Sequence, residues 1–126
     1  MSAELQVIVA YIQPFQMEAV VDAVRGIPNF PGMSVGEVRG FGSHGAHPPQ
    51  QGERSEVHAF ETRLRVEVFC RLEDVTDIVD AIRRAAHTGH AGDGKIFAGP
   101  VNPAYRIRTG EWGDDALLAA ARGGGG

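Results

Sequence analysis

Two short segments in the second half of the sequence carry residues that suit phosphate binding. Residues 88–97 include three glycines and Lys95. Glycines allow backbone N–H groups to converge on an anion, and a lysine adds a positive charge beside them. On composition alone, a tight turn that binds nothing accounts for this segment equally well.

The second segment, residues 106–111, contains two arginines. Because side chains alternate along an extended chain, Arg106 and Arg108 are predicted to point in the same direction. Two guanidinium groups so arranged could bind one phosphate through paired hydrogen bonds. The solvated edge of an amphipathic strand would show the same spacing, and only the combination with residues 88–97 favours a phosphate site.

The apolar pattern around these segments predicts two consecutive strand–helix–strand units. In the first unit, residues 5–12 form a strand, a helix runs from Met17 to near Gly26, and residues 34–41 form a second strand. The second unit repeats this order with a strand at 64–71, a helix at 75–86 and a strand at 95–98.

This order predicts an α+β fold, the ferredoxin-like βαββαβ sandwich, in which both helices cover one face of a four-stranded antiparallel sheet. The other face needs a cover, and a chain of 126 residues gains stability from association. Residues 43–59 between the two units have almost no apolar periodicity, as is typical of a long functional loop. The domain is predicted to span 1–116, followed by a flexible glycine-rich tail at 117–126.

Composition narrows the class of protein. Sixteen acidic and twelve basic residues give a formal charge of -4, which offers no general attraction to nucleic acid or to anionic membranes. The single cysteine, Cys70, lies in an apolar alternating run and is predicted to be a buried residue of a reducing compartment. No leader pattern and no apolar run near about 18 residues is present, so we expect a cytoplasmic protein without membrane insertion.

The motifs, taken in order and spacing, resemble those of the P-II signal transduction proteins. Gly40, Phe41 and Gly42 before the long loop resemble the family's T-loop entry, residues 88–97 its B-loop, and residues 106–111 its C-loop. The resemblance covers roughly residues 5–116. It implies a homotrimer whose sheets form a central barrel, with adenine nucleotide (ADP, ATP or AMP) bound in clefts between subunits.

The resemblance also implies which residues contact the nucleotide. The predicted phosphate and ribose contacts are Thr88, Gly92, Asp93, Gly94, Lys95, Arg106 and Arg108. The predicted adenine-side residues are Ser34, Gly40, Phe41, Gly42, Glu67 and Phe69.

The T-loop departs from the family pattern. Ser43 and His44 replace an arginine that meets the terminal phosphate and a glutamine that helps to coordinate magnesium and 2-oxoglutarate, so we predict a preference shifted toward ADP or AMP. Glu56 replaces the tyrosine that many members present for uridylylation, which predicts that this modification is absent. Arg63 replaces a lysine and can still hold a carboxylate or bicarbonate. The candidate second-effector residues are Gly42, Ser43, His44, Arg63 and Lys95.

The preferred hypothesis is a regulator without enzymatic activity, in which nucleotide orders or releases the T-loop and the T-loop docks on a partner protein. A membrane transporter is one candidate partner, and bicarbonate or another small carboxylate is the candidate second effector. A nitrogen regulator that senses ATP, ADP and 2-oxoglutarate is the alternative within the family. A small phosphatase of the same fold and a metal-responsive trimer using His44, His47 and His58 stay open, although no metal site is predicted from their loose spacing.

Overall fold

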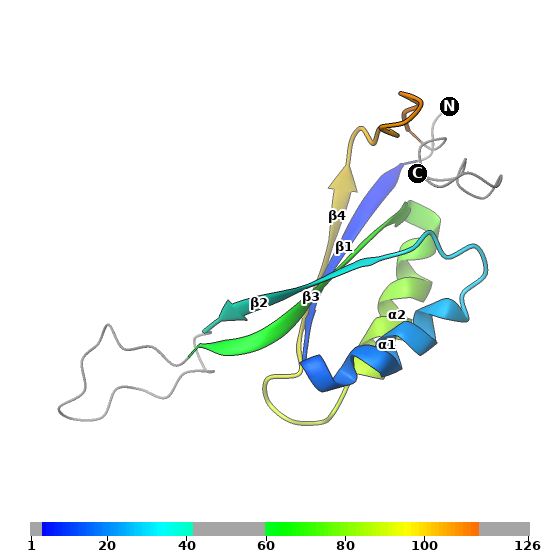
Figure 1. The fold of residues 1–126 in the computed structure, drawn as a ribbon. Coiled ribbons are helices and arrows are strands. Elements are labelled where there is room, and N and C mark those ends of the chain that lie inside the picture. Colours follow the sequence, from blue (N-terminus) through cyan, green and yellow to red (C-terminus); the bar gives the residue numbers. More distant parts are fainter. Residues whose placement is uncertain (1–3, 42–59, 114–126) are drawn as a thin grey trace.

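The computed structural model describes residues 4–41 and 60–113. In this part of the chain, four strands and two α-helices alternate as β-α-β-β-α-β, and a short 3-10 helix precedes each α-helix (Figure 1). The elements are β1 (Leu5–Ile12), η1 (Pro14–Gln16), α1 (Met17–Arg25), β2 (Ser34–Gly40), β3 (Glu61–Arg71), η2 (Leu72–Asp74), α2 (Val75–Ala86) and β4 (Gly94–Val101). The predicted α+β ferredoxin-like fold is confirmed.

The four strands form one antiparallel sheet in the order β2-β3-β1-β4. The register places Tyr11 of β1 between Arg65 of β3 and Lys95 of β4. Both helices lie on the same side of the sheet, and among residues 4–41 and 60–113 no helix covers the other side (Figure 1). The two faces of the sheet therefore have different neighbours.

The core lies between the helices and the covered face. Because side chains alternate along a strand, every second residue of β1 and β3 enters this core, and both helices add an apolar stripe. Each large aliphatic side chain buried in this way contributes about 1.5–3 kcal/mol. The largest fully buried side chains are those of Ile8, Ile12, Val20, Val24, Val66, Val68, Cys70, Ile78 and Ile82.

Cys70 belongs to this core, as the sequence predicts. It is 1% exposed, and burial, with a smaller contribution from the nearby charge of Asp74, raises the pKa of its thiol to about 11. A thiol that stays protonated at neutral pH is a poor nucleophile. Cys70 therefore acts as a small apolar residue.

The opposite face of the sheet, here called the open face, keeps large apolar side chains in contact with solvent. Phe69 of β3 is 42% exposed and Phe97 of β4 is 55% exposed. Tyr11 of β1 lies on the same face, with its ring edge-on to that of Phe97. The open face also carries Arg65, whose guanidinium lies 6.0 Å from the centre of the Tyr11 ring.

Some boundaries differ from the sequence expectation. β4 runs to Val101, beyond the predicted 95–98, because it pairs with the whole length of β1. Asp74 occupies the N-cap position of α2, but its side chain caps no N–H group.

The predicted T-loop at 43–59 and the tail at 117–126 lie outside the described residues. Neither helix of the described part is both long and apolar enough to cross a bilayer.

Candidate functional site

The segment between α2 and β4 is closed by its own aspartate. The Asp93 carboxylate accepts hydrogen bonds from the backbone N–H groups of Thr88 (2.8 Å) and Gly89 (3.0 Å), and also from the Thr88 hydroxyl. The hydrogen bond from the Thr88 hydroxyl, with those from the two N–H groups, lowers the pKa of Asp93 below its ordinary value. The loop of residues 88–93 is thus held by an ionised carboxylate.

The end of this loop packs tightly against β1. Gly94 has a φ of 111°, and a Cβ atom at this position would lie 1.7 Å from the carbonyl oxygen of Tyr11. Only glycine fits such a close approach of two backbones. The Gln13 side chain donates a hydrogen bond of 2.8 Å to the Gly92 carbonyl oxygen and holds the middle of the loop.

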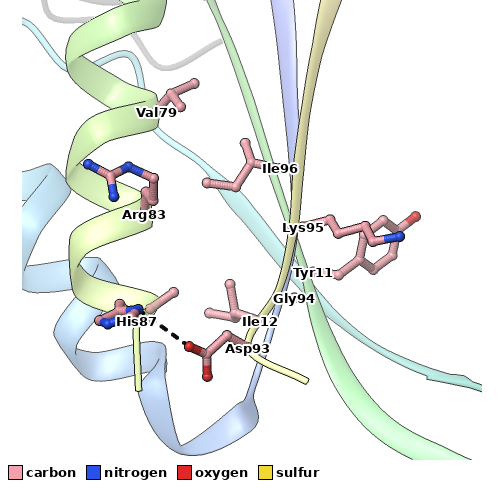
Figure 2. Close-up of a pocket in the computed structure, with 10 residues that line it drawn as sticks. Tyr11, Ile12, Val79, Arg83, His87, Asp93, Gly94, Lys95 and Ile96 are labelled. Carbon is pink, nitrogen blue, oxygen red and sulfur yellow. Dashed lines mark ion pairs between the residues drawn. The ribbon is translucent and has the colours of Figure 1, made fainter. Parts of the chain in front are cut away.

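Lys95 lies directly beyond the loop, at the start of β4. Figure 2 shows its side chain beside Tyr11, on the side of the sheet that faces away from α2. Lys95 is exposed and is the only lysine of the sequence. Its ammonium group is therefore on the open face, next to the closed loop.

A hollow of about 500 Å³ lies on the other side of β4, facing α2. This hollow is bordered on one side by Val79 and Arg83 of α2 and by His87, which directly follows α2. Ile96 of β4 lies on the opposite side (Figure 2). His87 Nδ1 lies 3.5 Å from the Asp93 carboxylate, which links the end of α2 to the closed loop. His87 is the C-cap residue of α2.

Residues 105–113 form a tight turn, and the prediction of an extended segment is wrong here. Arg106 N–H donates to the Glu111 carbonyl oxygen (2.7 Å), and Gly110 N–H donates to the Arg106 carbonyl oxygen (2.8 Å). Gly110 has a φ of 76°, which lets the chain reverse direction. Because the chain turns, Arg106 is 3% exposed whereas Arg108 is exposed. The two arginines are not presented as an alternating pair on one side of a strand.

Arg106 faces its own turn. Its Nε lies 3.8 Å from the Glu111 carboxylate, and the same carboxylate accepts a hydrogen bond of 2.8 Å from the Thr109 hydroxyl. A buried guanidinium next to a carboxylate supports the turn. Arg108 is the arginine of this segment that solvent reaches.

The predicted adenine-side residues fall into two places. Ser34, Glu67 and Phe69 border one hollow, with Pro31 and Met33 beside them. Gly40 and Phe41 lie at the other end of β2, where Phe41 packs edge-on against Phe60 with ring centres 5.1 Å apart. At about 3.3 Å per residue, the length of β2 separates the two places by about 20 Å.

The two arms of the predicted phosphate site lie at opposite ends of β4 (Figure 1). The six residue steps from Lys95 to Val101 alone span about 20 Å. A single chain therefore does not bring Lys95 and Arg108 to one phosphate group.

The predicted second-effector residues are described in part. Arg63 lies on the open face of β3, and its guanidinium bonds to the Glu61 carboxylate (2.6 Å) and to the Thr62 carbonyl oxygen (3.0 Å). A Cβ atom on Gly92 would lie 3.3 Å from the same guanidinium, so Arg63 borders the closed loop. Gly42, Ser43 and His44 lie outside the described residues.

The sequence reasoning missed three residues that shape these segments. Gln13 reaches the loop from 79 positions away, a contact that no local pattern indicates. Glu111 lies against Arg106 only because the chain turns, and Glu61 belongs to no motif of the sequence. The spacing of Glu61 and Arg63, two residues apart on one strand, was the signal that could have indicated their ion pair.

Most of the chain matches one protein family. The family model described as Nitrogen regulatory protein P-II matches residues 5–111. The chain belongs to the P-II family. Two relatives described as Nitrogen regulatory protein P-II, from Azospirillum brasilense and Cereibacter sphaeroides, are 39% and 40% identical over 108 residues. In both cases the match covers 86% of this chain and 96% of the relative.

A solved P-II structure has the same fold. The Arabidopsis thaliana PII protein bound to citrate superposes with a TM-score of 0.73 and is 29% identical, with 91% of each chain covered. P-II proteins are non-enzymatic regulators that act on partner proteins and bind small effector ligands. The chain is accordingly a signalling regulator of this family, and the phosphatase hypothesis is set aside.

The metal hypothesis gains no support from the part of the chain that the structure describes. No group of three or more His, Cys, Asp or Glu side chains in residues 4–41 and 60–113 could hold a metal ion. The histidines named for that hypothesis, His44, His47 and His58, lie outside these residues.

Proposed function

We propose that this P-II protein senses adenine nucleotide in clefts between subunits and controls a partner protein through residues 43–59. The observation that carries the proposal is the closed loop at 88–93, which Asp93 holds in one conformation while Lys95 extends beside it. A preformed backbone loop suits a polyphosphate because the ligand does not have to order it, and the exposed ammonium group beside it adds a positive charge.

The roles of the two C-loop arginines differ in this proposal. Arg108 is exposed and is the residue that contacts phosphate. Arg106 is buried beside Glu111 and positions the turn that carries Arg108. The exposed ring of Phe69, with Glu67 and Ser34 around the same hollow, offers an apolar surface and a hydrogen-bond acceptor for adenine.

The distance between the two ends of β4 supports a site made by two subunits. Lys95 of one subunit and Arg108 of the next would meet at one nucleotide in a cyclic homotrimer. P-II proteins form trimers, and the exposed aromatic rings on the open face are the surface that such an assembly would bury.

Mixing two variants tests the shared site. Lys95→Ala and Arg108→Ala proteins should each bind ADP weakly, and their co-refolded mixture should regain wild-type affinity at about a quarter of the interfaces. Titration calorimetry measures that fraction. A site contributed by one subunit alone would regain nothing on mixing.

The effector preference is tested on the full chain by calorimetry with ATP, ADP and AMP, alone and with bicarbonate or 2-oxoglutarate. Because Ser43 stands where the family has an arginine, we propose a preference for ADP or AMP; ATP binding at least about tenfold tighter than ADP would contradict it. The names of the relatives favour nitrogen regulation as the second candidate. Cooperative binding of ATP with 2-oxoglutarate would support that candidate, and cooperation with bicarbonate would oppose it.

A further inference from the structure

On the open face of β3, Arg63, the proposed anion-binding residue, is already paired with a carboxylate of its own strand. Glu61 and Arg63 are two residues apart on one strand, so their side chains leave the same face of the sheet. The Arg63 guanidinium lies 2.6 Å from the Glu61 carboxylate. This distance is that of a short charge-assisted hydrogen bond.

We propose that Glu61 is a built-in competitor that sets the affinity of the second effector. The proposal rests on the proposed function, because it takes Arg63 to be the group that holds a small carboxylate or bicarbonate anion. A bound anion and the Glu61 carboxylate offer Arg63 the same chemistry, a negatively charged oxygen pair. The anion must therefore displace Glu61 before it takes its place.

The surroundings of Arg63 make this exchange consequential. Its side chain is 21% exposed, and the guanidinium borders Gly92 of the closed loop. Glu61 pairs with Gly40 across the sheet and follows Phe60, which packs on Phe41. When an anion replaces Glu61 as the partner of Arg63, the Glu61 carboxylate loses its paired cation. The distribution of charge therefore changes between the closed loop and the ends of β2 and β3 that residues 42–59 connect.

A second ion pair, at the end of β3, provides an internal reference. Arg71 pairs with Glu73 over the same two-residue spacing, but at 3.5 Å and at the opposite end of the strand. Both pairs join an arginine to a carboxylate two residues away. Of these two pairs, the one formed by Arg63 borders the closed loop.

The test is titration calorimetry of the full chain with sodium bicarbonate and, separately, with 2-oxoglutarate, each in the absence and presence of saturating ADP. Glu61→Gln removes the competing charge and should tighten binding of the anion that acts as effector by about three- to tenfold. ADP affinity measured without the anion should stay unchanged. The matched control Glu73→Gln should alter neither affinity, and Arg63→Ala should abolish the gain in the Glu61→Gln background.

The outcomes separate this inference from the proposed function. If the wild-type chain does not bind ADP, the nucleotide proposal itself is contradicted. Normal ADP binding, with anion affinity unchanged or weakened in Glu61→Gln, would overturn the competitor role alone. An equal gain in Glu73→Gln would also overturn it, because the effect would then be one of net charge. Tighter binding by only one of the two probes identifies which anion the site takes.

Discussion

The two ends of β4 use a carboxylate in opposite ways. At one end, Asp93 binds backbone N–H groups of its own loop, and the neighbouring cation, Lys95, extends to solvent. At the other end, Glu111 lies against the cation of its own turn, Arg106, which is buried. The comparison teaches that the number of basic residues in a motif does not equal the number available to a ligand.

The largest effect should come from filling the backbone contact at the loop end. Gly94→Ala would place a methyl group 1.7 Å from the Tyr11 carbonyl oxygen, so the loop or the end of β1 has to move. We expect a loss of at least about 3 kcal/mol in the free energy of unfolding, measured by urea denaturation. Gly99→Ala on the same strand meets open space and should change stability by less than about 1 kcal/mol.

The second test breaks the turn at the other end. Arg106→Ala removes a buried guanidinium from beside Glu111 and should lower stability by about 2 to 4 kcal/mol, with nucleotide affinity lost as a consequence. Arg108→Ala in the same turn should leave the unfolding free energy within about 0.5 kcal/mol of wild type and weaken only the nucleotide. Equal stability of the two variants would contradict the positioning role of Arg106.

The third test isolates the exposed cation. Lys95→Ala should weaken ADP binding by about 1.5 to 3 kcal/mol, the scale of a charge-assisted contact, without a change in thermal stability. Arg84→Ala removes the same charge from an exposed position on α2 and serves as the control. Calorimetry gives both affinities, and a similar loss in the control would point to long-range charge in place of a contact.

The smallest effect concerns acid stability. The folded-state pKa of Asp93 is lowered, so its stabilising contribution is present above the unfolded pKa of about 3.9 and disappears as pH falls through the folded value. Asp93→Asn should therefore show a shallower loss of stability than wild type below about pH 4. Urea midpoints measured at several pH values check this slope; parallel curves would mean that the carboxylate does not stabilise the loop.

Much of the fold could be predicted from the sequence because each element has a strong periodic pattern. The alternation of Leu64, Val66, Val68 and Cys70 requires one covered face, and the stripe through Ile78 and Ile82 supplies the cover. The loop between α2 and β4 could also be predicted, since its glycines are needed at turns and close approaches. Gly94 is the clearest case.

The rest could not be predicted because it depends on how the chain turns and on distant contacts. The prediction for Arg106 and Arg108 assumed an extended segment, and hydrogen bonds from the backbone of Arg106 and Gly110 made a turn instead. The contact between Gln13 and Gly92 forms only once β1 and β4 are paired. Sequence spacing also gave no sign that the length of β4 separates Lys95 from Arg108.

A two-probe titration tests the shared nucleotide site most directly, because each end of β4 has one unique reporter. Lys95 is the only lysine and Trp112, in the turn at the far end, is the only tryptophan. Reductive ¹³C-methylation of Lys95 keeps its charge. On addition of ADP, the Lys95 methyl NMR signal and the Trp112 fluorescence should change together and saturate with the same Kd. A Lys95 signal that stays fixed while calorimetry records ADP binding would contradict the account.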